Sequence, residues 1–368
     1  MPKTLLFRSE DLRSFIQRFF TRLNVPPDHA AIAADILLAA DLRGVDSHGI
    51  IRLNTYYGVR LRKGLINPLS PTKTIHETTT TLAMDGGNGL GMVVGYQAMH
   101  HCIERARQSG VSMVTVRNSN HYGIAGYYAM MALPEEMIGI SYTNSQPLVA
   151  PTYGRSAIIG TNPIAVAVPT NHERPFVLDM ATSIVPIGRI TVYDKAGKPI
   201  PEGWGIDITG QVTTDPKAVL NGGALLPLGG IDLMRGYKGY GLGLMVDIFS
   251  GVLSGASFLS HVGRPEKADH GANVGHFFAA IRIDAFRPVE EFKANMDQVI
   301  QELKESPKAI NQERIYIPGE KEYERTERYL QDGVPLLENV AESLQKAGEE
   351  IGVPFVNPIG STEGEEES

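Results

Sequence analysis

Residues 85–95, DGGNGLGMVVG, decide which kind of α/β fold this chain adopts. Gly89, Gly91 and Gly95 stand between an expected strand and an expected helix. Their spacing resembles the glycine pattern of doubly wound dinucleotide-binding folds, with the last glycine shifted by one. A glycine-rich turn explains the same residues equally well. A doubly wound fold normally starts the chain at this motif, whereas here a largely helical stretch precedes it. We therefore predict an α/β (α+β) fold that is not of the Rossmann type.

Upstream of the glycines the pattern is helical. Apolar residues recur at helical spacing from Leu12 to Leu23, and Asn24 and Pro26 end that helix. A second, alanine-rich helix is expected over residues 28–42. A third is expected after Gly44, with His48 and Arg52 in its first turns.

Downstream of the glycines, strands and helices alternate up to about residue 286, and the pattern is helical again after Pro288. We predict a mixed β-sheet domain with helices over residues 76–289. The two ends, residues 1–75 and 290–368, are expected to form one discontinuous helical domain. The acidic end, GSTEGEEES, is expected to be disordered.

Composition narrows the function classes. The chain has 368 residues, a formal charge of −7 and a single cysteine, Cys102. A negative chain gives no support to nucleic-acid binding or to binding of anionic membranes, and one cysteine excludes an intramolecular disulfide. No signal peptide and no apolar run of membrane length is recognised, so a cytoplasmic location is expected.

His48 and Arg52 are the first candidates for chemistry. They are four residues apart, which on a helix places both side chains on one face. A histidine titrates near neutral pH and can move a proton, and an arginine can bind a carboxylate through two hydrogen bonds. His121 follows an expected strand in the stretch NSNHYG, which is a usual place for a site in an α/β layer.

Further polar groups lie at expected strand ends and helix starts. Thr161 and Asn162 precede a strand, Asp179 ends one, and Arg189 and Lys238 are cations close to loops whose amides suit a phosphate. Taken singly, each is better explained by a glycine-rich turn that closes a sheet.

A metal site is not expected. His261, Asp269, His270 and His276 occur close together, but none has the i, i+4 spacing of a zinc-binding helix. We interpret this segment as a mobile polar loop, and the adjacent His100 and His101 as a surface pair.

Seven ordered motifs carry a family resemblance: DLRGVDSHGIIRL, VRNSNHYGIAGYY, GTNPIAVAVPT, LDMATS, GKPIPEGWGID, LNGGALLPLGG and GYKGYGLGLMVDIFSGVLSG. Together they resemble the malate/L-lactate dehydrogenase family that is unrelated to the Rossmann-type enzymes. The resemblance implies a mixed-sheet domain that binds NAD or NADP, a helical domain built from both termini, and a homodimer. It also implies a site in the cleft between the domains.

The resemblance assigns roles to individual residues. His48 and His121 are the two candidates for proton transfer, and the choice between them stays open. Arg52 is expected to bind the substrate carboxylate, and Ser47, Thr161 and Asn162 to line the substrate site. The positions expected to hold the cofactor are Ser145, Asp179, Met180, Ala181, Ser183, Arg189, Lys238, Pro318, Gly319 and Glu320.

These assignments predict an NAD(P)-dependent oxidoreductase that acts on a small 2-hydroxy or 2-oxo acid, with malate and oxaloacetate first. The alternatives are a lactate, sulfolactate or ureidoglycolate dehydrogenase, or a reductase of cyclic imino acids. A non-catalytic nucleotide-binding relative is a third possibility, disfavoured by the proton-transfer groups. The sequence does not decide between NAD and NADP or fix the substrate side chain.

Overall fold

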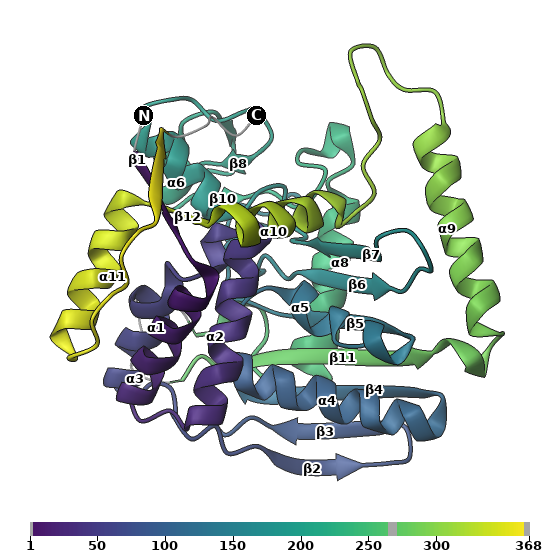
Figure 1. The fold of residues 1–368 in the computed structure, drawn as a ribbon. Helices are drawn as coiled ribbons and strands as arrows, with labels where there is room; N and C mark the ends of the chain where they lie inside the picture. Colours follow the sequence, from purple (N-terminus) through teal and green to yellow (C-terminus); the bar gives the residue numbers. More distant parts are fainter. Residues whose placement is uncertain (1–2, 264–270, 364–368) are drawn as a thin grey trace.

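A seven-stranded mixed sheet forms the centre of the computed structural model, which describes residues 3–263 and 271–363 (Figure 1). The strand order is β2-β3-β4-β11-β5-β6-β7. Within this sheet β3 and β4 are parallel, and the other neighbouring strands are antiparallel. The strands are Lys73–Glu77 (β2), Thr81–Asp85 (β3), Val111–Ser119 (β4), Met137–Thr143 (β5), Ile164–Val168 (β6), Phe176–Met180 (β7) and Val274–Arg282 (β11).

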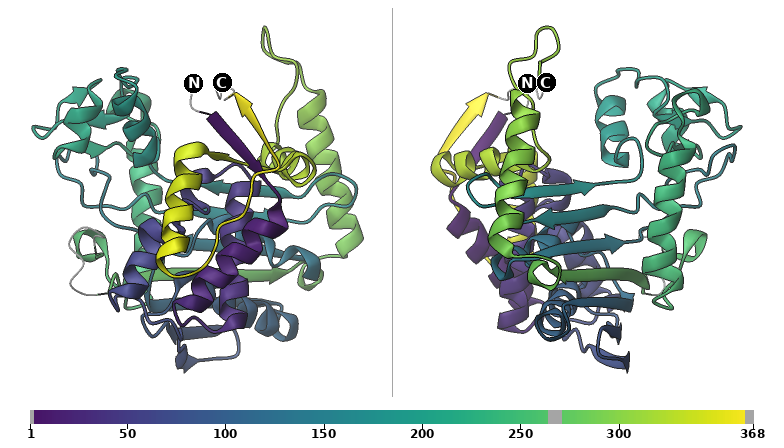
Figure 2. Two further views of the ribbon diagram at one scale, coloured as in Figure 1. Left: turned by 60° about the vertical axis from the view of Figure 1, so that its left-hand side comes forward. Right: turned by 90° about the vertical axis from the view of Figure 1, so that its right-hand side faces the viewer.

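Helices cover both faces of the sheet, because side chains of the central strand β11 alternate between them. Phe278 and Ala280 join the main core, which includes α4 (Gly91–Ser109) and α5 (Ala125–Met130). Phe277 points the other way and packs on Phe249, with ring centroids 4.9 Å apart. Phe249 lies in a π-helical segment, η5 (Ile248–Val252), that continues α8 (Tyr237–Asp247). Figure 2 shows the sheet between these layers.

The two ends of the chain meet in a small antiparallel sheet that sequence patterns did not predict. Its strands are β1 (Lys3–Phe7), β12 (Val334–Leu337) and β13 (Gly360–Glu363), with β1 in the middle. The expected disorder of the acidic end is therefore wrong for its first four residues, while residues 364–368 lie outside the described part. Apolar contacts between Phe7, Phe15 and Phe355 close this region.

The helices around this small sheet agree with the helical patterns. They are α1 (Ser9–Arg22), α2 (Pro27–Leu42), α10 (Glu320–Asp332) and α11 (Glu338–Glu350). The apolar face of α1, from Leu12 to Phe20, is buried as its spacing predicts. The remaining long helix, α9 (Val289–Glu305), stands at the opposite end of the sheet (Figure 1).

Short elements complete the chain. A second small sheet joins β8, β9 and β10 beside α6 and α7. These elements and the other short ones are α3 (Val59–Arg62), α6 (Ile187–Lys195), α7 (Pro216–Leu220), β8 (Gly205–Ile206), β9 (Val212–Thr213), β10 (Ala224–Leu225), η1 (Asp46–His48), η2 (Leu53–Gly58), η3 (Leu133–Glu135), η4 (Asp232–Met234), η6 (Leu259–His261) and η8 (Ile283–Ala285). Within the described part of the chain, no helix is long and apolar enough to span a membrane.

The expected third helix starts later than predicted: the helical segment of η2 and α3 begins after Arg52, and His48 lies outside it. His48 ends the short 3-10 helix η1, and Gly49 then takes an extended conformation, so the two residues do not share a regular helical turn. The buried carboxyl group of Asp41 accepts the amide hydrogen of Ile50 at 2.7 Å and lies directly against Gly49. This tertiary contact outweighs the local helical pattern.

The glycines of residues 85–95 serve close packing. A Cβ atom on Gly91 would lie 2.0 Å from the carbonyl oxygen of Asn120 and 2.4 Å from that of His121. The amide of Leu90 donates to Ser70 Oγ at 3.0 Å. The beginning of α4 therefore supports the loop that carries His121, and its first turn is occupied by protein groups.

This close approach predicts that Gly91→Ala lowers the free energy of unfolding by about 2 kcal/mol or more, since two backbone carbonyls would have to move. Gly188→Ala is the matched control, because a Cβ there meets no atom within 4 Å, and its effect should stay within about 0.5 kcal/mol. Chemical denaturation of both variants measures the difference. Equal stabilities would contradict the packing role of Gly91.

Candidate active site

The strand register collects the candidate loops at one edge of the large sheet. Ser119 at the end of β4 pairs with Val274 at the start of β11, and His276 on β11 pairs with Thr143 at the end of β5. Ile164, which begins β6, pairs with Met180, which ends β7. The residues that follow or precede these ends include His121, Ser145, Thr161, Asn162, Ala181 and Ser183. One sheet edge thus carries six of the predicted site residues.

His276 connects the strand ends beneath this edge. Its Nδ1 lies 2.8 Å from Thr143 Oγ1, and its Nε2 lies 2.8 Å from Ser119 Oγ. Its ring stacks on that of Tyr122 with centroids 4.6 Å apart. The side chain is fully buried, and burial lowers its pKa to about 3, so the ring is neutral. The prediction of a mobile polar loop is therefore wrong for His276; residues 264–270 lie outside the described part.

The two candidate histidines stack on each other. The rings of His48 and His121 have centroids 5.3 Å apart, although 73 positions separate them in the sequence. Nδ1 of His48 lies 2.8 Å from Ser47 Oγ, and Nε of Arg52 donates to the carbonyl oxygen of Ser47 at 2.7 Å. The turn at Ser47 therefore brings Arg52 and His48 together even though no regular helix does.

Two consecutive tyrosines hold His121 from the other side. Tyr57 Oη lies 2.7 Å from His121 Nδ1, and the ring of Tyr56 lies 5.4 Å from the imidazole. Both come from the π-helical segment η2, and such segments often occur at functional sites. The Gly123 amide also lies 3.3 Å from Nδ1. With Nδ1 occupied by the protein, the imidazole offers Nε2 to a ligand.

Both histidines are neutral in the free protein. Burial, and then the charge of Arg52, lowers the pKa of His48 to about 4. Burial also lowers the pKa of His121 well below its usual value, and the neighbouring His48 and Arg52 act in the same direction. An anion bound at Arg52 would cancel part of this effect and raise both pKa values.

Asp179 lies on β7 with a solvent-accessible side chain. Its Oδ2 accepts the amide hydrogen of Gly126, the second residue of α5, at 2.7 Å. The dense protein around it raises the pKa of the carboxyl group to about 6, while the Gly126 amide and the charge of Arg43 oppose the rise. Arg43 is buried and stacks over Tyr323 of α10. Asp179 is thus hydrogen-bonded to the start of α5 and lies close enough to the end of α2 for the charge of Arg43 to affect its pKa.

Ser145, Thr161 and Asn162 form one hydrogen-bonded group. Ser145 Oγ accepts the amide hydrogen of Thr161 at 3.0 Å, and Asn162 Oδ1 accepts that of Ser145 at 3.1 Å. Asn162 Nδ2 donates to the carbonyl of Gly243 in α8 at 2.9 Å. Because both ends of the buried Asn162 amide are engaged, its side chain shapes the site, and the hydroxyls of Ser145 and Thr161 are the groups better placed to reach a ligand.

The remaining predicted cofactor residues lie on or directly after β7, on α6 and α8, and in the turn before α10. Met180 and Ala181 continue from β7, and the Ser183 hydroxyl donates to the Val185 carbonyl at 2.8 Å. Arg189 on α6 and Lys238 on α8 are exposed cations. Neither forms an ion pair within residues 3–263 and 271–363.

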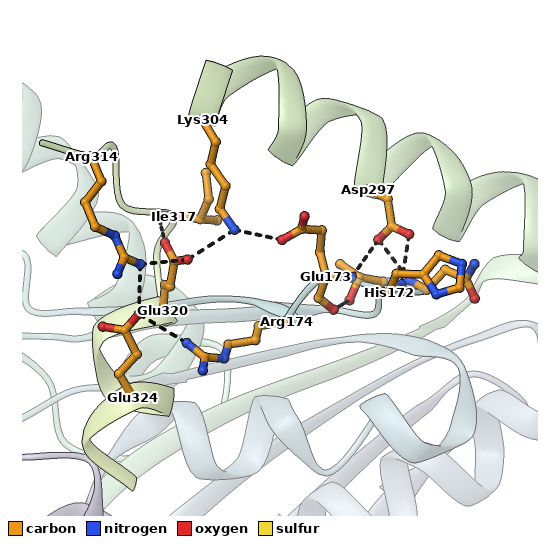
Figure 3. A network of polar contacts seen from close by, with 11 residues as sticks. His172, Glu173, Arg174, Asp297, Lys304, Arg314, Ile317, Glu320 and Glu324 are labelled. Carbon is orange, nitrogen blue, oxygen red and sulfur yellow. Dashed lines mark hydrogen bonds and ion pairs between the residues drawn. The ribbon is translucent and has the colours of Figure 1, made fainter. Parts of the chain in front are cut away.

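The turn from Pro318 to Glu320 lies beside β7 and carries an ion-pair network (Figure 3). The Pro318 carbonyl accepts the amide hydrogen of Val177 at 3.0 Å, and Gly319 has a φ of 93° that favours glycine. The buried carboxylate of Glu320 pairs with Lys304 at 3.1 Å and Arg314 at 3.0 Å. The Glu320 side chain therefore ties α9 and the following loop to α10, and only the backbone of the turn is left for a ligand.

Several residues of this region were not chosen as site residues from the sequence, among them Arg43, Arg60 and His276. Arg43 and Arg60 stand next to the chosen motifs, but a surface position explains an isolated arginine equally well. His276 stood in a stretch whose polar composition hid the strand. Only the pairing of β11 with β4 and β5 gives it its place.

Comparison with known proteins places this chain in a family. The model of the malate/L-lactate dehydrogenase family matches residues 7–345. A malate dehydrogenase of Pyrococcus abyssi is 51% identical over 94% of both chains. A malate/(S)-sulfolactate dehydrogenase of Methanothermus fervidus is 36% identical over 95% of this chain and 99% of its own. The structure of malate dehydrogenase from Pyrococcus horikoshii superposes with a TM-score of 0.89 at 47% identity, covering 96% of this chain and 97% of that one.

The matched family and the relatives make this chain an oxidoreductase that acts on hydroxy acids. The chain belongs to the malate/L-lactate dehydrogenase family.

The Asp179 environment predicts a measurable titration. Its carboxyl group should titrate near pH 6, and at a higher pH in Arg43→Gln, because removing a positive charge destabilises the carboxylate. Carboxyl ¹³C NMR measures both values, with Asp179→Asn to assign the signal and the exposed Arg62→Gln as control. A lower or unchanged value in Arg43→Gln would contradict the coupling.

Proposed function

We propose that this chain catalyses the reversible, NAD(P)-dependent oxidation of a small 2-hydroxy acid, with malate as the first substrate. The observation that carries the proposal is the stacked pair of His48 and His121 with Arg52 held beside it by Ser47. A proton-transfer group and a fork-shaped cation are what oxidation of a 2-hydroxy carboxylate requires of the protein. The names of the relatives, malate and malate/sulfolactate dehydrogenases, support malate as the first choice.

In the oxidation direction, Arg52 binds the substrate carboxylate and places the 2-hydroxyl group at the histidine pair. His121 then accepts the hydroxyl proton at Nε2, while Nδ1–H donates to Tyr57 Oη. Arg52 neutralised by the carboxylate no longer lowers the pKa of the ring as strongly, so proton uptake becomes easier. We choose His121 over His48 because Tyr57 fixes its Nδ1: Tyr57 Oη can accept the Nδ1 hydrogen while its own hydrogen is directed to the His121 carbonyl oxygen at 3.4 Å. His48 stacks on it and keeps water away from one face.

The donor set at the sheet edge fits a nicotinamide cofactor, which when bound exchanges a hydride with carbon 2 of the substrate. The hydroxyls of Ser145 and Thr161 and the carboxylate of Asp179 suit the amide and ribose groups. Arg189 and Lys238 suit the phosphates, because they are exposed and free of ion pairs in the described residues. Met180, Ala181, Ser183 and the backbone of Pro318, Gly319 and Glu320 complete the proposed contacts. The choice between NAD and NADP depends on Arg189.

We further propose that the cofactor domain, residues 76–289, is not of the Rossmann type. The single parallel pair of strands in its large sheet supports this.

Residues 1–75 and 290–368 are proposed as the second unit, supported by the pairing of β1 with β12 and β13. We propose a cytoplasmic homodimer. Apolar side chains exposed along α8 and η5 support the dimer: Leu242, Ile248, Val252 and Leu253.

A panel of acceptors tests the proposal. Oxidation of NADH and NADPH is followed at the reduced-nicotinamide absorbance band with oxaloacetate, pyruvate, sulfopyruvate and a cyclic imine. We expect the fastest turnover with oxaloacetate. Turnover of the imine alone would instead favour the cyclic imino-acid reductase, which uses the same carboxylate anchor. Cofactor binding without turnover of any acceptor would contradict the enzymatic role.

Two variants test the role of each residue. We expect His121→Gln to lower kcat by about 10²- to 10⁴-fold with little change in KM, since general acid–base catalysis contributes that range. Arg52→Gln should mainly raise KM, by about 10- to 100-fold, because a charged hydrogen-bonded contact to the substrate is lost. Steady-state kinetics of both are compared with the exposed His101→Gln on α4. Full activity of His121→Gln with an inactive His48→Gln would move the proton transfer to His48.

A further inference from the structure

Arg60 is a buried cation without a counter-charge. Its side chain, in α3, is 3% exposed. Nε and Nη1 are shielded from solvent and have no hydrogen-bond partner, and no carboxylate of the described residues forms an ion pair with it. Leaving a buried charge unpaired is costly, so such a group usually has a partner that completes it. The contrast with Arg62 is clear, because that exposed arginine of the same helix donates to Asn54 Oδ1.

The guanidinium group of Arg60 lies beside the candidate active site. Its Cζ is 5.1 Å from the centre of the Tyr56 ring, and that ring is 5.4 Å from the His121 imidazole. Arg52 and Arg60 both oppose the rise in the pKa of the Tyr56 hydroxyl that burial causes. Tyr56 therefore stands within the influence of two cations, of which only Arg52 has a role in the proposed reaction.

The chemistry of a dianionic substrate accounts for a second cation. A 2-hydroxy acid such as lactate has one anionic group, which Arg52 alone satisfies. Malate and sulfolactate have a second, a carboxylate or a sulfonate on carbon 3. Residues 52 and 60 are eight positions apart, which in a helix is about 12 Å between their Cα atoms, and their long side chains can converge on one small molecule.

We propose that Arg60 recognises this second anionic group and thereby selects dianionic over monoanionic 2-hydroxy acids. The proposal rests on the proposed function and adds the residue that decides the substrate class. Tyr56 holds the guanidinium group by a cation–π contact, and the anion supplies the missing charge. A guanidinium group can bind a carboxylate or a sulfonate, so the test uses one substrate with each group.

The test compares Arg60→Gln with wild type and with Arg62→Gln, using oxaloacetate, sulfopyruvate and pyruvate and the preferred cofactor. We expect Arg60→Gln to lower kcat/KM for oxaloacetate by about 100-fold, mainly through KM, and to leave kcat/KM for pyruvate within about threefold. Arg62→Gln should keep the wild-type ratio. A matching loss with sulfopyruvate would show that the site accepts either anion, and a loss with one acid only would identify the anion recognised.

An equal loss for pyruvate and the dianionic acids would overturn the proposal, because Arg60 would then only hold Tyr56 against His121. If Arg60→Gln does not fold, competitive inhibition of the wild-type enzyme tests the proposal instead. Succinate should compete with oxaloacetate at least about tenfold more strongly than propionate, and equal inhibition would overturn the proposal. If the wild type turns over none of the acids, the proposed function itself fails. This outcome is distinct from a failure of the Arg60 proposal alone.

Discussion

The position of the candidate site depends on His276, a buried histidine at the centre of the sheet edge. Its two ring nitrogens contact the hydroxyls of Ser119 and Thr143, the last residues of two strands that flank β11. The ring of Tyr122, the residue after His121, stacks on the ring of His276. Because the neutral ring joins two strand ends and one loop, the loops with His121 and Ser145 start from fixed points.

A second constraint brings the N-terminal region to this edge. Asp41, at the end of α2, holds the amide of Ile50 and leaves no room for a side chain at position 49. The chain must turn there, and the turn presents His48 to His121. Gly91 does the same for the opposite loop by letting α4 approach its carbonyls. Small residues and one buried carboxyl group thus set a distance on which proton transfer would depend.

The electrostatics of the site follow from this crowding. Burial keeps both histidines neutral, and the fixed charge of Arg52 adds to the effect. The dense protein around Asp179 raises the pKa of its carboxyl group, which therefore takes up a proton more readily than usual. Perturbed pKa values of this kind are typical of sites that handle protons and charged ligands.

Local sequence determined much of this protein. Helical spacing from Leu12 to Leu23, alternating patterns and glycine or proline stops gave α1, α2, α4, α9 and the strands of the large sheet, since these signals depend on near neighbours. The motifs also marked His48, Arg52, His121 and Asp179. Tertiary structure alone decided the rest. The strands β1, β12 and β13 are short and pair across more than 300 positions, and His276 gains its partners from the pairing of β11 with β4 and β5. Contacts between distant segments leave no periodic trace in the sequence, because each residue in them satisfies a partner that local patterns do not contain.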